Sequence, residues 1–373
     1  MEVTVSTPSR ICLFGEHQDY LGLEVIASAV NLRFTAKARP AQGEKLQIVI
    51  RDESISELGQ SNEEGKFERH EVDLSGGIYY HHKRDYFRSV VKVLRRAGYC
   101  VPAAQVWMDS TIPIGKGMCS STTMVLALTA ALAQLSRPEE KLDPIQMARL
   151  AHQAEVVEFD EPGGMMDHFA SALGGLVHLD FAGPAKAQRL NVSLKGCFLL
   201  FDSLQQKDTI RVLSQSKYPT LEALEQLRQY GAGTLRELAQ HPRREELLLE
   251  LSEEKRRKVI ANLKNYAIER RAYELFQAGQ MEDETLGRLL NEHQQNLRDG
   301  LGISTPLIDQ ILRTALAQGA YGGKFNGSGG GGCLFVYAPR DRADSILHSV
   351  KEMGYPGMVL SQDAGLTVEV AKA

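Results

Sequence analysis

The first fifty residues alternate between apolar and polar side chains, which predicts β-strands with one buried face. Segments 3–5 and 11–14 look like short strands, and segments 25–40 and 46–51 show the alternation. Pro8 separates the first two, and we expect the last two to share one sheet. The polar segment 52–66 is expected to be an exposed excursion without chemistry of its own. Residues 85–97 then space their apolar side chains three and four apart, which predicts a helix that ends at Gly98.

The rest of the chain mixes helical spacing with short apolar runs. Further helices are expected at 145–159, 167–173, 220–278, 286–297 and 306–318. Further strands are expected at 176–179, 197–202, 333–338 and 366–370. A chain of 373 residues is long enough for two domains. Segment 181–188 is the expected boundary, because Gly, Pro and small residues follow an apolar strand there.

Composition and charge exclude several classes of protein. The net charge is −4 with interspersed signs, so there is no electrostatic reason to expect nucleic acid or an anionic membrane as a partner. No apolar run is long enough to span a bilayer, and the N-terminus lacks a signal-peptide pattern, so a cytoplasmic protein is expected. The five cysteines are scattered, which favours free thiols, and the histidines form no zinc-binding pattern.

Segment 112–132, IPIGKGMCSSTTMVLALTAAL, leads from glycines and hydroxyl residues directly into an apolar stretch. Gly115 and Gly117 would let the backbone turn close to a ligand. Ser120 to Thr123 fall where the first-turn amides of a helix have no intrahelical partner. Unpaired amides, hydroxyls and the helix dipole attract anions, so we expect a phosphate-binding loop that opens a buried helix. The alternative is an ordinary N-cap ahead of a core helix.

Two other turns carry groups of interest. GEHQDYLG, at 15–22, would place Glu16, His17 and Asp19 on one loop, which suits binding of a polyhydroxylated ligand. The alternative is a solvent-exposed turn without a binding role, which has the same composition. Asp167 stands at the start of a short helix, where a carboxylate can also simply complement the helix dipole.

Glycine fills seven of the eleven positions from 322 to 332, GGKFNGSGGGG, and a strand follows. A flexible linker would explain this glycine content. The segment is bounded tightly by a helix and by the strand, however, and a loop whose amides approach phosphates or a neighbouring helix needs residues without Cβ atoms. We therefore expect a structured glycine-rich loop.

The three segments together resemble the motifs of the GHMP kinase superfamily, and the galactokinase branch is the nearest match. SRICLFGEHQDYLG resembles the galactokinase signature around G-E-H-T-D-Y, PIGKGMCSST resembles P-x-G-x-G-L-x-S-S, and GGKFNGSGGGGC resembles G-x-K-x-T-G-x-G-x-G-G-C. Order and spacing fit over most of the chain, with about 204–278 poorly matched. The resemblance implies a two-domain α+β fold with the active site in the cleft between the domains. Residues 1–182 would form a ribosomal-S5-like domain, and residues 183–373 a ferredoxin-like domain with the glycine-rich motif.

The resemblance also implies a kinase that uses ATP and Mg²⁺ to phosphorylate the anomeric hydroxyl of a galactose-like monosaccharide. Asp167 and Arg10 match the catalytic residues. The positions that match sugar-binding residues are Glu16, His17, Asp19, Gly164 and, at a different spacing, Tyr218. The positions that match nucleotide-binding residues are Gly115, Gly117, Met118, Cys119, Ser120, Ser121, Thr122 and Tyr86. Ser121 and Glu155 match the Mg²⁺ ligands. For Tyr86, core packing is the alternative.

In the phosphate loop and the third motif, the residues that depart from the family pattern are similar in size or polarity to those they replace. Cys119 replaces Gly or Ser, and Asn326 and Ser328 replace Thr and Ala, so ATP use remains expected. The family's tryptophan near the adenine is absent, with Lys83 at about that place.

The identity of the sugar stays open, because segment 202–211 lacks the galactokinase pattern. A kinase for a hexuronic acid, arabinose or fucose is the alternative, and Lys207 or Arg211 could serve a sugar acid. A galactokinase-like sugar sensor is an alternative of another class. A nicotinamide dehydrogenase is disfavoured, because the glycines do not form G-x-G-x-x-G in a βαβ unit.

Overall fold

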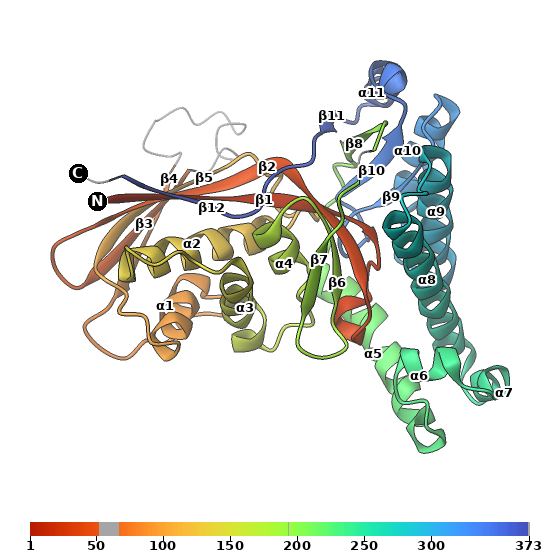
Figure 1. Ribbon diagram of the computed structural model, residues 1–373, viewed down its shortest axis with the longest axis horizontal. Helices are drawn as coiled ribbons and strands as arrows, with labels where there is room; N and C mark the ends of the chain where they lie inside the picture. The colour runs from red at the N-terminus through yellow and green to blue at the C-terminus, as the bar shows by residue number, and fades with distance from the viewer. Residues whose placement is uncertain (52–66, 193, 372–373) are drawn as a thin grey trace.

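The computed structural model describes residues 1–51, 67–192 and 194–371, which form two β-sheets with helices packed against them (Figure 1). The predicted excursion at 52–66 lies outside the described residues. The strands of the larger sheet are β1 (Glu2–Phe14), β2 (Val25–Pro40), β3 (Lys45–Arg51), β4 (Phe67–Asp73), β5 (Ala104–Ser110), β6 (Leu176–Asp180), β7 (Lys186–Arg189) and β12 (Thr367–Ala371). The strands of the smaller sheet are β8 (Cys197–Asp202), β9 (Gly322–Phe325), β10 (Cys333–Ala338) and β11 (Gly357–Leu360).

Strand β1 lies inside the larger sheet, between β2 and β12, and is antiparallel to both. The prediction of two short strands separated by Pro8 is wrong, because β1 is continuous through that residue. Its register with β2 shifts between Pro8 and Ser9, which lets the strand continue past a residue that has no amide hydrogen. Strands β2 and β3 share the sheet as predicted, with β5 between them.

Four helices cover one face of the larger sheet (Figure 1). They are α1 (Tyr86–Arg96), α2 (Ser120–Ser136), α3 (Pro144–Glu155) and α4 (Met166–Leu173). Helix α2 packs on β1 and β2 and is buried on nearly every side, which confirms the predicted buried helix. Helix α3 ends at Glu155, earlier than predicted, and a 3₁₀ turn follows at Val157–Phe159.

The remaining helices belong to the part of the chain after β8. They are α5 (Thr209–Leu227), α6 (Leu235–Gln240), α7 (Arg244–Leu249), α8 (Glu253–Gln277), α9 (Asp283–Gln295), α10 (Pro306–Ala317) and α11 (Ala343–Glu352). The helix predicted at 220–278 is divided, because Gly231 adopts a positive φ and Thr234 and Ser252 cap new helices. Sequence patterns missed α11 and the strands β4, β5, β7, β9 and β11. None of the described helices is long and apolar enough to cross a membrane.

The chain passes from the larger sheet to the smaller one after β7, which pairs with β6. Segment 181–188, the expected boundary, includes the first residues of β7 and so still contributes to the larger sheet. Strand β12 then returns to the larger sheet beside β1, where Ala371 pairs with Glu2 (Figure 1). The division into domains at 1–182 and 183–373 stays a prediction.

Asn326, in the loop between β9 and β10, ties the two sheets together. Its side chain is completely buried. Its Oδ1 accepts a hydrogen bond from the Cys12 amide at 3.0 Å. Its Nδ2 donates to the carbonyl oxygens of Gly117 at 3.0 Å and Arg10 at 3.2 Å. One side chain therefore holds β1 and the loop before α2 against the loop of the smaller sheet.

Asn326→Asp is expected to lower the free energy of unfolding by about 2 to 5 kcal/mol. The aspartate would keep the acceptor, but it would lose both donated hydrogen bonds, place a carboxylate oxygen against the carbonyl oxygens of Gly117 and Arg10, and add a buried charge. Urea unfolding measures the loss. Asn31→Asp is the matched control, because the exposed Asn31 side chain only accepts a hydrogen bond, from the Ser361 amide at 2.9 Å. Equal stability of Asn326→Asp and the parent would contradict the proposed tie.

Candidate active site

A cavity of about 380 Å³ is lined by segments from both halves of the chain. They include the loop at residues 15–22, called the sugar loop for its expected role, and the loop at 112–119, called the phosphate loop for the same reason. The starts of α2, α4 and α5, the segments 84–86 and 155–164, and the glycine-rich loop (326–332) also contribute. The predicted site residues that line the cavity are Arg10, Glu16, His17, Asp19, Tyr86, Gly115, Gly117, Cys119, Ser120, Ser121, Thr122, Glu155, Gly164 and Asp167. Segments far apart in the sequence thus converge on one site.

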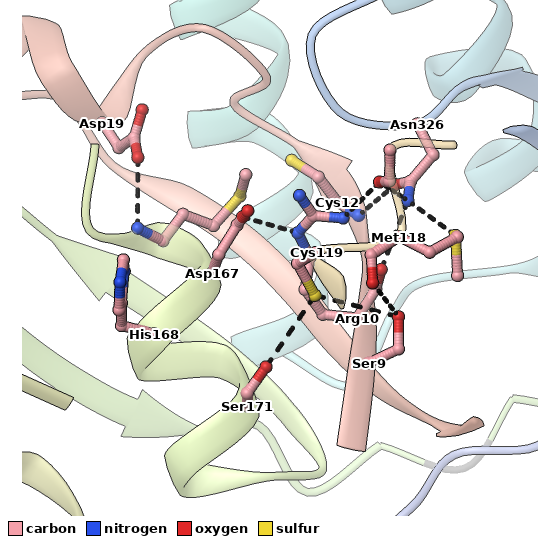
Figure 2. Close-up of polar contacts among 12 residues, drawn as sticks. Ser9, Arg10, Cys12, Asp19, Met118, Cys119, Asp167, His168, Ser171 and Asn326 are labelled. Carbon is pink, nitrogen blue, oxygen red and sulfur yellow. Dashed lines mark hydrogen bonds and ion pairs between the residues drawn. The ribbon is translucent and has the colours of Figure 1, made fainter. Parts of the chain in front are cut away.

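Arg10 and Asp167, which both line the cavity, form an ion pair (Figure 2). Arg10 Nε lies 2.7 Å from Asp167 Oδ1, and Arg10 Nη1 donates to the carbonyl oxygen of Gly117 at 3.0 Å. Burial alone would lower the pKa of Arg10, but Asp167 and neighbouring acidic groups outweigh burial and raise it. Arg10 is therefore a permanent positive charge beside a carboxylate that remains 27% exposed.

Glu16, in the sugar loop, is paired with a lysine from the other sheet. Lys324 Nζ lies 2.5 Å from Glu16 Oε2, and both side chains are buried. The same ammonium donates to the carbonyl oxygens of Cys12 at 3.0 Å and Phe325 at 2.8 Å. All three donors of Lys324 are thus used, which is the condition under which a buried ammonium is tolerated. The pair fixes the Glu16 carboxylate at the wall of the cavity.

Asp19 is held by backbone amides at the other side of the sugar loop. Its Oδ2 accepts from the Met166 amide at 3.1 Å and its Oδ1 from the Tyr20 amide at 2.9 Å. Burial, with the negative charge of Asp167 nearby, raises the pKa of Asp19 to about 6. A Cβ atom on Gly164 would lie 1.9 Å from Asp19 Oδ2. Glycine at this position is therefore needed to admit the Asp19 carboxylate.

His17 bridges the sugar loop and the glycine-rich loop. Its Nε2 lies 3.0 Å from the carbonyl oxygen of Ser328, and its Nδ1 lies 2.8 Å from the Tyr20 hydroxyl. The imidazole is buried, and His17 has a positive φ of 64°. The resemblance assigned this side chain to the sugar, but its two nitrogens already have protein partners.

The phosphate loop adopts the left-handed backbone that its glycines permit. Gly115, Gly117 and also Cys119 have positive φ. Cys119, the N-cap residue of α2, makes no side-chain cap, so the first-turn amides of α2 remain available to an anion. Its thiol lies between Ser9 and Ser171 (Figure 2), and burial raises its pKa to about 11.

Glu155 lies beside the first turn of α2. Burial would raise its pKa, but His168 and the hydroxyls of Ser121 and Thr122 outweigh burial and lower it. His168 Nε2 lies 2.8 Å from Glu155 Oε2, but the two atoms are not aligned as a hydrogen bond. The buried Oε2 thus lacks a hydrogen-bond partner within the described residues. Glu155 and Ser121 together offer a hard oxygen site that fits Mg²⁺.

Aromatic and charged side chains line the far end of the cavity. Tyr86 packs edge-on against Phe159, with ring centroids 5.7 Å apart, and it also lines the cavity. Its contact with a nucleotide stays a prediction. Arg84, which has a positive φ of 60°, pairs with Glu161. Sequence analysis missed both members of this pair, although each lines the cavity.

Lys207 reaches the cavity from the segment before α5. Its Nζ would lie 2.6 Å from a Cβ atom on Gly117, so it sits against the phosphate loop. Burial and the positive charge of Arg10 lower its pKa to about 8. Among the described lysines and arginines that line the cavity, it alone has neither an ion pair nor a hydrogen bond.

Tyr218 and Met118 do not line the cavity. Tyr218 lies in α5 and is 49% exposed, because that helix already begins at Thr209 and turns this residue outward. Tyr20 is the tyrosine that lines the sugar-loop side instead. The Met118 side chain is completely buried, and its carbonyl oxygen accepts from the Ser9 hydroxyl at 2.7 Å.

Three parts of the chain match known families. Residues 1–40 match the galactokinase galactose-binding signature, residues 85–175 the GHMP kinases N-terminal domain, and residues 273–356 the GHMP kinases C-terminal domain. The chain is 27% identical over 368 residues to the galactokinase of Roseiflexus sp., which covers 94% of this chain and 87% of that protein. It is 26% identical over 374 residues to the mevalonate kinase of Thermococcus onnurineus, which covers 99% of both.

A solved structure of Lactococcus lactis galactokinase complexed with galactose is similar to this fold. The TM-score is 0.79 at 19% identity, and the match covers 98% of this chain and 95% of that chain. The likeness concerns the fold and agrees with the expected two-domain α+β architecture. The family matches at both domains and over residues 1–40 show that this chain belongs to the GHMP kinase superfamily.

Proposed function

We propose that this chain is an ATP-dependent kinase that phosphorylates the anomeric hydroxyl of a galactose-like monosaccharide, giving a sugar 1-phosphate and ADP. One observation carries the proposal. The Arg10–Asp167 ion pair lines a single cavity with the sugar loop and the open N-terminus of α2. Arg10 donates to Gly117 of the phosphate loop, and the Met166 amide beside Asp167 donates to Asp19 of the sugar loop. A sugar hydroxyl and a terminal phosphate bound at these two places would meet at that pair.

The residues at the ion pair suit phosphoryl transfer. Asp167 is partly exposed to the cavity, so its carboxylate is available to accept or orient the proton of the attacking hydroxyl. Arg10 holds that carboxylate and places a positive charge beside the transferring group. The first-turn amides of α2 and Lys207 add to the neutralisation. Positioning and charge neutralisation are the main requirements of this chemistry.

Ser121 and Glu155 are the residues that would hold Mg²⁺. The buried Glu155 Oε2 without an aligned partner and the adjacent Ser121 hydroxyl fit an ion that takes a few protein oxygens and keeps waters and phosphates as its other ligands. Mg²⁺ bound there would neutralise phosphate charge. The cavity end near Tyr86 would accommodate the nucleoside.

The sugar-loop side of the cavity supports a neutral sugar. It presents the carboxylates of Glu16 and Asp19, which accept hydrogen bonds from hydroxyls. Lys324 and Arg10 are each committed to a carboxylate, so a substrate carboxylate would depend on Lys207. This arrangement disfavours a hexuronic acid. Mevalonate, which also carries a carboxylate, is the second candidate, because mevalonate kinases are among the relatives.

A panel of substrates tests the proposal. ADP release is measured with ATP and Mg²⁺ for galactose, arabinose, fucose, galacturonate and mevalonate. Galactose, or a sugar that shares its C4 configuration, is expected to give the highest kcat/KM, with phosphate on C1 by NMR. Chelation of Mg²⁺ is expected to abolish the release. Turnover confined to mevalonate would contradict the sugar assignment, and sugar binding without ADP release would indicate a sensor.

Asp167→Asn separates chemistry from binding. The amide keeps the size of the side chain but removes the charge that accepts the hydroxyl proton, so kcat is expected to fall roughly 10²- to 10⁴-fold. The dissociation constant of the sugar, measured by calorimetry, is expected to stay near the parent value. Asp160→Asn is the matched control, because Asp160 is exposed, does not line the cavity, and has a positive φ that asparagine tolerates. An Asp167→Asn enzyme at full speed would overturn the assignment.

A further inference from the structure

His168 is a buried histidine whose two ring nitrogens have no hydrogen-bond partner within the described residues. It follows Asp167 in the first turn of α4 (Figure 2), lines the cavity, and is only 1% exposed. Nearly all buried polar atoms in proteins have a partner, so an exception requires an explanation. His152 packs edge-on against the ring, with ring centroids 5.2 Å apart, and so holds it in place. His168 is therefore a fixed imidazole at the cavity wall whose nitrogens are available to a ligand.

The group that faces this imidazole is the Glu155 carboxylate. Nε2 of His168 lies 2.8 Å from Oε2 of Glu155, but the two atoms are not aligned as a hydrogen bond. Two atoms that carry lone pairs can lie this close only with a proton or a metal ion between them. Neighbouring ligands of an octahedral ion, each at about 2.1 Å from the metal, lie about 3 Å apart. The distance from Nε2 to Oε2 thus fits two ligands of one ion.

We propose that His168 is a further protein ligand of the divalent cation at Glu155 and Ser121, and that the site therefore selects a transition-metal ion such as Co²⁺ or Mn²⁺ over Mg²⁺. This inference rests on the proposed function, which places a divalent cation and nucleotide phosphates at these residues. The hydroxyls of Ser121 and Thr122 face the same carboxylate. One nitrogen, one carboxylate oxygen and one hydroxyl would leave coordination positions for phosphate oxygens and water.

The nitrogen ligand decides which ion is preferred. Mg²⁺ takes oxygen ligands, whereas imidazole suits transition-metal ions, whose affinity for a mixed nitrogen and oxygen site rises from Mn²⁺ to Co²⁺. His168 is therefore expected to add more affinity for Co²⁺ and Mn²⁺ than for Mg²⁺. A ligating imidazole usually donates its other N–H to a carboxylate, a carbonyl or a water. Since Nδ1 of His168 has no partner in the part of the chain that the structure describes, water is the expected acceptor.

Pulsed electron paramagnetic resonance of bound Mn²⁺ tests the contact directly. The chain, without an affinity tag, is prepared with unlabelled and with ¹⁵N-labelled histidine and is then given Mn²⁺ and a non-hydrolysable ATP analogue. The parent is expected to show a nitrogen coupling that changes with the isotope, because a histidine nitrogen is bonded to the ion. His168→Gln is expected to lose this coupling. The glutamine amide can still donate to Glu155, so a role of His168 as a mere hydrogen-bond donor would survive the substitution.

Metal competition measures the preference. Dissociation constants for Mn²⁺, Co²⁺ and Mg²⁺ are determined with the ATP analogue bound. Relative to Mg²⁺, the parent is expected to favour Mn²⁺ and Co²⁺ more than the free analogue does. His168→Gln is expected to weaken Mn²⁺ and Co²⁺ binding by at least about 10-fold, the loss that removal of even an outer-shell partner causes, and to weaken Mg²⁺ binding much less.

His348→Gln is the matched control for these measurements. His348 also lies beside a carboxylate, with Nε2 3.3 Å from Oε1 of Glu352, but its side chain is 71% exposed and does not line the cavity. All three dissociation constants are expected to stay at the parent values in this variant. Thermal unfolding of both variants shows whether they are folded, and the isotope experiment on the parent requires no variant.

The outcomes separate this inference from the proposed function. Mn²⁺ bound to the parent without a histidine coupling would overturn the role of His168 and leave the proposed function intact. A coupling that persists in folded His168→Gln would come from another histidine and would also overturn it. Equal weakening of all three ions in His168→Gln would show that His168 only orients Glu155, which contradicts the inference. A parent that shows the coupling and the metal preference but phosphorylates no sugar would support the metal site and overturn the sugar assignment alone.

Discussion

The site depends on a buried contact between strand β1 with its sugar loop and the glycine-rich segment of the other sheet. Lys324 is completely buried, and its ammonium is tolerated only because Glu16 and two carbonyl oxygens use all three donors. Removal of one partner of such a pair leaves an uncompensated buried charge, at a cost of about 3 to 5 kcal/mol. Lys324 and Glu16 come from opposite halves of the chain. The requirement to pair them therefore fixes the sugar loop against the smaller sheet and defines the cavity wall.

The positions of the charged and polar groups around the cavity matter more than their number. Acceptors gather on the sugar loop, and open amides and Lys207 gather at the phosphate loop. The Arg10–Asp167 pair lies between them. The net charge of the chain, −4, indicates none of this. Burial, followed by the charges nearby, lowers the pKa of His17 and raises the pKa of Asp19.

Local signals predicted most of the elements and motifs, because glycines, caps and apolar spacing act over a few residues. They placed the start of α2 correctly. They placed the glycine-rich loop only in part, because residues 322–325 form strand β9. They failed where distant contacts decide. The register shift at Pro8 depends on β2, and the outward position of Tyr218 depends on how early α5 begins.

The central claim is that sugar and nucleotide bind in one cavity and meet at Arg10 and Asp167. A crystal structure of the ternary complex with galactose and a non-hydrolysable ATP analogue tests it most directly. The account predicts that the anomeric hydroxyl faces Asp167 and that the terminal phosphate lies at the N-terminus of α2, beside Ser121 and Glu155. Either ligand bound elsewhere, such as in the groove between α8 and the π-helical turn Asn296–Leu301, would contradict it.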